Sequence, residues 1–163
     1  MQLNRLKPFL IIAALVCTWA AFYTFYTKKG PVSGNQVLEI RDTATGRIYG
    51  QWPLEEGGKF AIEFVHSVNQ SPVRETFINE GSVIRLFSVR FFSFGAGMQS
   101  DLEEGWELSR DGDAIVISGF STTFRELNYI VGTVSDHFLF LNGETISLRE
   151  LCGRNAQITI RLK

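Results

Sequence analysis

The stretch that decides the fold reads FAIEFVHSVNQSPVRETF over residues 60–77. Apolar and polar side chains alternate along both of its halves, which is the pattern of β-strands that bury one face. A short polar loop with a proline, residues 68–72, separates the two halves. This arrangement predicts an antiparallel hairpin, and the sequence on both sides of it also has strand-like patterns.

Stretches rich in β-branched and aromatic residues fill the chain after residue 36, each bounded by Gly, Asn or Asp. Asp111-Gly112 and Asn142-Gly143 are typical of hairpin turns, because such turns need positive φ angles. Residues 147–153 can form a single helical turn. About ten short strands indicate an all-β fold, either an antiparallel β-sandwich or a partly closed barrel. The expected strands cover residues 37–41, 47–52, 60–67, 73–79, 83–94, 106–109, 114–118, 126–131, 138–141, 145–148 and 157–162.

The amino-terminal segment has a different character. Residues 9–27 carry no charge and are rich in aromatic residues towards their end. Such a stretch nearly spans a hydrocarbon core of about 30 Å. We therefore expect one transmembrane helix within an anchor over residues 1–29, a linker over 30–36, and a β domain over 37–163. A signal peptide that is cleaved near Ala20 or Ala21 remains the alternative.

The short amino-terminal tail indicates on which side of the membrane the β domain lies. A very short tail before an apolar segment is typical of a signal anchor, which places the β domain outside the cytoplasmic (inner) membrane.

Residues 30–163 hold 12 basic and 17 acidic side chains, a net charge of −5. Such a domain repels phosphate polyanions, so we expect no nucleic-acid partner. With only two Cys and two His in the chain, we expect no metal site, no cofactor and no disulfide framework.

His66 and Glu75 are the first candidate site. Pairing Phe64 with Phe77 keeps the two rings together and places His66 opposite Glu75 on the same face. The pair is either a ligand-facing site or a structural contact that closes the hairpin. Ser67 points to the other face, which argues against a serine hydrolase, and no complete catalytic group can be assembled. We therefore expect a protein that is not an enzyme.

Loops supply the remaining candidates. The polar loop at the hairpin tip contains Asn69 and ends at Pro72, and loops on rigid scaffolds are where binding residues concentrate. Gly95 and Gly97 follow the longest apolar run and fit a loop that lets backbones approach closely. Arg90 lies inside that run, so it must be paired or lie at an edge, and an internal salt bridge is the expected outcome.

The same residues carry a resemblance to a known family. The HSV…PVxE stretch resembles a bacterial family of unknown function, whose members are small proteins with an amino-terminal apolar segment. Members are frequently encoded beside TRAP transporters of the TAXI type. The resemblance covers residues 37–162 and supplies no catalytic residues. The residues that carry it are His66-Ser67-Val68, Pro72-Val73, Glu75 and Phe77, followed by Phe94-Gly95-Ala96-Gly97.

The resemblance implies a role in the uptake of organic acids. On this basis we expect a membrane-anchored accessory domain that contacts a TRAP permease or its binding protein. The alternative is a periplasmic domain that binds a small ligand, a carboxylate or a lipid, around His66, Glu75 and the neighbouring loops.

Overall fold

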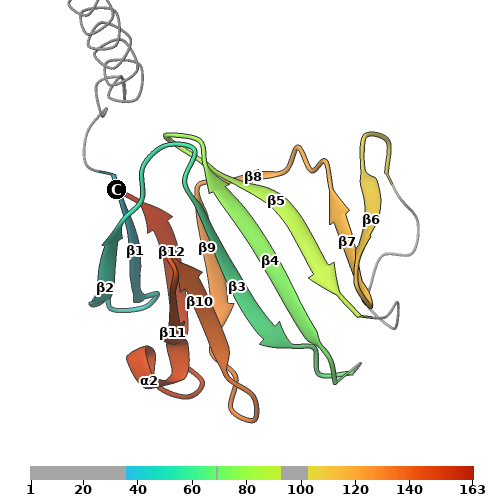
Figure 1. Ribbon diagram of the computed structural model, residues 1–163. Coiled ribbons are helices and arrows are strands. Elements are labelled where there is room, and N and C mark those ends of the chain that lie inside the picture. Colours follow the sequence, from blue (N-terminus) through green and yellow to red (C-terminus); the bar gives the residue numbers. More distant parts are fainter. Residues whose placement is uncertain (1–35, 69, 93–102) are drawn as a thin grey trace, which may run out of the picture. The chain divides into compact units, whose positions relative to one another are not determined.

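A computed structural model describes residues 36–68, 70–92 and 103–163 of the chain (Figure 1). The expected anchor and the candidate residues Asn69, Gly95 and Gly97 lie outside these described residues. Among the described residues, no helix is both long and apolar enough to cross a membrane.

Two antiparallel sheets form the described domain, which confirms the all-β prediction (Figure 1). The smaller sheet has the strand order β2-β1-β12-β9, and the larger has the order β11-β10-β3-β4-β5-β7-β6, with β8 paired to β5. Neither sheet closes on itself, so the barrel alternative is not the one adopted. The smaller sheet consists of β1 (Val37–Asp42), β2 (Ile48–Pro53), β9 (Glu126–Ile130) and β12 (Gln157–Leu162).

The larger sheet contains the hairpin predicted over residues 60–77. Its strands are β3 (Lys59–Val65), β4 (Pro72–Asn79), β5 (Ile84–Phe91), β6 (Glu107–Asp111), β7 (Ala114–Ser118), β8 (Thr123–Phe124), β10 (His137–Leu141) and β11 (Glu144–Ser147). The two-residue strand β8 was not predicted. Its pairing with β5 depends on a segment far along the chain, and two residues are too few to show alternation.

The predicted hairpin turns have the positive φ angles that their sequences indicate. Gly112, Asn142 and Gly143 have φ angles of 60°, 53° and 82°, which confirms the predicted β6–β7 and β10–β11 turns. The predicted helical turn is also present as α2 (Leu148–Cys152). Its N-cap is Ser147, whose hydroxyl oxygen accepts a hydrogen bond of 3.0 Å from the backbone N–H of Glu150.

The main core lies between the two sheets. Fully or nearly fully buried side chains come from both of them, among them Leu38, Ile40, Ile158 and Ile160 from the smaller sheet and Phe60, Ile62, Phe77 and Leu139 from the larger. A second cluster of buried residues draws on β4, β5 and β7 and on Phe120, without a residue of the smaller sheet. The inner face of the larger sheet therefore extends beyond the edge of the smaller sheet, which ends at β9.

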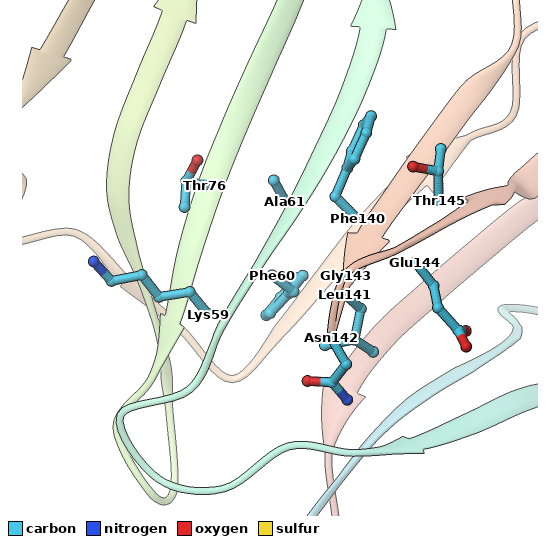
Figure 2. Close-up of a pocket in the computed structure, with 10 residues that line it drawn as sticks. All are labelled: Lys59, Phe60, Ala61, Thr76, Phe140, Leu141, Asn142, Gly143, Glu144 and Thr145. Carbon is cyan, nitrogen blue, oxygen red and sulfur yellow. The ribbon is translucent and has the colours of Figure 1, made fainter.

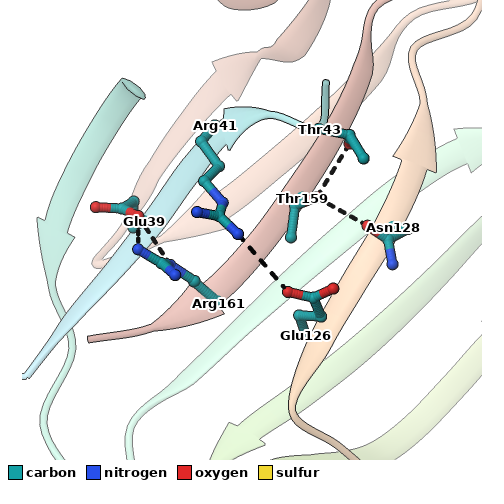
Figure 3. Close-up of polar contacts among 7 residues, drawn as sticks. All are labelled: Glu39, Arg41, Thr43, Glu126, Asn128, Thr159 and Arg161. Atoms are coloured by element: carbon teal, nitrogen blue, oxygen red, sulfur yellow. Dashed lines mark hydrogen bonds and ion pairs between the residues drawn. The ribbon is translucent and has the colours of Figure 1, made fainter. Parts of the chain in front are cut away.

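Polar contacts on the outer face of the smaller sheet hold β9 in place (Figure 3). Thr159 on β12 donates its hydroxyl to Oδ1 of Asn128 at 2.8 Å. Arg41 on β1 lies 4.0 Å from the carboxylate of Glu126. Because β9 pairs along its length only with β12, these side-chain contacts add to the attachment of an edge strand.

Candidate functional site

The β3–β4 hairpin pairs in a different register from the predicted one. Phe60 lies opposite Phe77, and Ile62 lies opposite Glu75. The prediction that Glu75 faces His66 is therefore wrong, as is the prediction that Phe64 faces Phe77. The faces themselves were assigned correctly, because a shift of four residues along a strand leaves each side chain on its original face.

The loop between the strands explains the register. Strand β3 ends at Val65, so His66 belongs to the loop, where its backbone N–H donates to the carbonyl of Ser71 at 2.9 Å. The backbone N–H of Gln70 donates to the carbonyl of His66 at 2.9 Å, and the Gln70 side chain donates to the carbonyl of Ser67. These bonds close a tight turn that fixes Val65 opposite Pro72. Ser67 and Pro72 are both exposed.

Glu75 has another partner, Tyr129. The hydroxyl of Tyr129, on β9 of the opposite sheet, donates to Oε2 of Glu75 at 2.6 Å. Burial raises the pKa of Glu75, although the bond from Tyr129 acts in the opposite direction. Burial also raises the pKa of Tyr129, and the carboxylate beside it adds to this effect. Sequence reasoning missed Tyr129, because it comes from a strand that is 54 residues away.

This pair lies on the wall of a cavity of about 390 Å³ that runs along β9. The rings of Phe77 and Phe124 meet edge to face, with their centroids 6.4 Å apart. The walls come from β4, β5, β8 and β9, so strands of both sheets shape the cavity. Its lining residues are Glu75, Phe77, Leu86, Phe124, Glu126, Leu127, Asn128 and Tyr129.

A second cavity, of about 350 Å³, brings together the two histidines that the sequence could not place relative to each other. His66 and Ser67 line it from the hairpin loop, and His137 from β10. The His137 ring stacks on Phe64 with centroids 5.3 Å apart, and its Nδ1 accepts the backbone N–H of Gly132 at 3.1 Å. Burial lowers the pKa of His137, which favours the neutral ring. His137 is therefore a packed, partly buried histidine.

The outer face of the larger sheet carries a third, shallow cavity of about 290 Å³ (Figure 2). Ala61 on β3 lies between Thr76 on β4 and Phe140 on β10, and Lys59 lines the cavity from the start of β3. The Lys59 ammonium lies 3.3 Å from the centroid of the Phe87 ring, and the Arg74 guanidinium 3.9 Å from that of Phe140.

Ion pairs hold the arginines of this outer face. Arg74 pairs with Glu63 at 2.9 Å. Arg90 lies 3.2 Å from the exposed carboxylate of Asp111, so it is paired within the chain, as predicted. Within the described ranges, no group of three or more His, Cys, Asp or Glu side chains is arranged to hold a metal ion.

These features define a two-sheet β domain with an acidic and aromatic cavity at the edge of its smaller sheet. A family model described as "Domain of unknown function (DUF1850)" matches residues 60–148, and the chain belongs to this family. This confirms the prediction of an uncharacterised domain family, and the matched region contains Glu75, Tyr129 and both histidines. Comparisons with curated proteins and with solved structures returned no match.

The raised pKa of Glu75 leads to a prediction on stability. Below its ordinary value, 4.5, the carboxyl is protonated in both the folded and the unfolded chain. As the pH rises above that value, the unfolded chain loses this proton first, so the free energy of unfolding falls until the folded form has also ionised. Glu75→Gln keeps an acceptor for Tyr129 and removes this loss. We expect the variant to be more stable than the parent at pH 7 and the difference to become small at pH 4.

Denaturant unfolding at the two pH values measures this difference. Glu107→Gln, on the exposed strand β6, makes the same change in net charge and serves as the matched control. A Glu75→Gln variant less stable than the parent at pH 7 would mean that the fold favours the ionised carboxylate.

Proposed function

We propose that this chain is a membrane-anchored, extracytoplasmic domain that binds a small molecule in the cavity along β9 and is not an enzyme. The observation that carries the proposal is Glu75. Its carboxyl stands on the inner face of β4 between Val73 and Phe77, both buried, and within the described part of the chain its hydrogen-bond partner is the Tyr129 hydroxyl. A carboxyl in apolar surroundings costs stability, and such groups are concentrated at functional sites.

The dimensions of the cavity support the proposal. A volume of about 390 Å³ lies at the lower end of the range for ligand cavities, about 300–1,000 Å³. Most of the lining is aromatic or aliphatic, with a few polar groups converging on it, as in sites that bind small molecules. Phe77 is only 2% exposed, so this wall is part of the rigid core.

A role as a transporter accessory domain is the second candidate. It rests on the resemblance to proteins encoded beside TRAP transporters, and one observation favours it. On the outer face of the larger sheet, Lys59, Arg74 and Arg90 each lie over a phenylalanine ring. Aromatic residues and Arg are enriched at protein–protein interfaces, which makes this face a candidate contact surface for a partner protein.

One experiment separates the two functions. We would purify the full chain from detergent-solubilised membranes and identify what accompanies it by native mass spectrometry. A bound small molecule is expected, and Asn128→Trp should reduce its occupancy, because Asn128 is exposed and lines the cavity. Gln157→Trp is the matched control, since it places the same ring on an exposed position of the neighbouring strand β12.

Recovery of a TRAP permease or its binding protein, without a small molecule, would overturn the binding proposal and support the accessory function.

The same spectra test whether the amino-terminal anchor stays attached. An intact mass that includes the first 20 residues is expected, whereas the mass of a chain that begins near Ala21 would mean that the signal is cleaved.

A further inference from the structure

We propose that the ligand of the cavity along β9 is an organic ammonium ion with a compact apolar body. This inference rests on the proposed binding function and names the chemical class of its ligand. It differs from the carboxylate or lipid that the sequence suggested. Three properties of the cavity lead to it.

The first property is charge. None of the described residues that line the cavity is Lys, Arg or His, and two of them are Glu. Glu126 is paired with Arg41, but an anionic ligand would meet the Glu75 carboxylate with no described cation between them, a juxtaposition that complementary sites avoid. Arg41, which contacts Glu126 at 4.0 Å, reaches it from the outer face of the smaller sheet and does not line the cavity (Figure 3).

The second property is the environment of Glu75. Its neighbours on the same face of β4 are the buried side chains of Val73 and Phe77, and its hydrogen-bond donor, Tyr129, is neutral. Glu75 is half-buried, and a hydrogen bond from a neutral group leaves the negative charge of such a carboxylate without a countercharge. A ligand cation supplies that compensation, and an N–H of a primary or secondary ammonium can in addition donate to the carboxylate.

The third property is the aromatic wall. Phe77, Phe124 and Tyr129 all line the cavity beside the two carboxylates. The electron-rich face of an aromatic ring attracts an ammonium ion, and recognition of alkylammonium ligands commonly combines such rings with an acidic side chain. Leu86 and Leu127 provide apolar surface for the remainder of the ligand.

Three matched compounds test the inference: 2-phenylethylammonium, the neutral 2-phenylethanol and the anion 3-phenylpropanoate. Their binding to the full chain in a non-ionic detergent can be measured by calorimetry, with a detergent-only blank. The ammonium should bind about tenfold or more tightly than the alcohol, and the anion should bind most weakly. Glu75→Gln should weaken the ammonium about tenfold and leave the alcohol unchanged, whereas Glu107→Gln on β6 should change neither.

The outcomes distinguish the inference from the function on which it rests. If the alcohol or the anion binds as tightly as the ammonium, the ligand class is wrong and the binding function stands. If none of the three compounds binds, while a molecule co-purified from membranes does occupy the cavity, the ligand class is again wrong. If no compound binds and nothing co-purifies, the binding function and the inference fail together.

Discussion

Replacing Phe77 with alanine should lower the free energy of unfolding by about 4 kcal/mol. Phe77 is 2% exposed and lies in the core between the two sheets. Its ring stacks on Phe60 with centroids 5.3 Å apart and meets the ring of Phe124 edge to face. Alanine would remove both ring contacts and leave a cavity that the surrounding strands cannot fill. Urea unfolding of the parent and the variant measures the change.

Two further variants show whether the loss comes from burial. Phe77→Leu keeps most of the apolar volume and should cost only about 1–2 kcal/mol. Phe92→Ala makes the same truncation at a residue that is 40% exposed, and should cost less than about 1 kcal/mol. A loss below about 2 kcal/mol for Phe77→Ala would contradict the packing described for the inter-sheet core.

Asn79→Ala should be the next most damaging change, with a loss of about 3 kcal/mol. Asn79 is fully buried at the end of β4. Its side-chain amide donates to the carbonyl of Leu54 and to Oε1 of Gln36, both at 2.9 Å, and its Oδ1 accepts the N–H of Gly81 at 2.8 Å. The alanine variant would leave a buried carbonyl without its donor, which costs more than an exposed hydrogen bond.

Asn142→Gly provides the comparison for this result. Asn142 is exposed, donates a single side-chain hydrogen bond to the carbonyl of Pro53, and has a positive φ angle that glycine also adopts. We expect this variant to lose less than about 1 kcal/mol in the same denaturation assay. Equal losses at the two positions would mean that burial does not decide the cost at Asn79.

Alternation and turn residues were sufficient to predict most of the strands. The segments 37–41, 73–79 and 157–162 agree with β1, β4 and β12 to within a residue at either end. The expected strands 60–67 and 83–94 were too long, because β3 ends at Val65 and β5 at Phe91. Periodicity alone does not mark where hydrogen-bonded pairing stops.

The candidate site was predicted less well, for a reason that the β3–β4 hairpin illustrates. Side-chain faces repeat every two residues, so a register shifted by four residues is compatible with the same alternation. The turn from His66 to Ser71 selects the register through backbone hydrogen bonds, which the sequence does not reveal. Glu75 was recognised as a candidate, but its partner Tyr129 depends on how the two sheets face each other.

The strand pairing has a consequence for how this chain can be divided. The region matched by the family model, residues 60–148, supplies the larger sheet but only β9 of the smaller one. Strands β1 and β2 precede it and β12 follows it, and Ile40 on β1 lies opposite Ile160 on β12. The two ends of the domain thus meet to complete its second layer. A fragment cut at the family boundaries would expose Phe60, Ile62 and Leu139 to water, so the folding unit is larger than the segment by which the family is recognised.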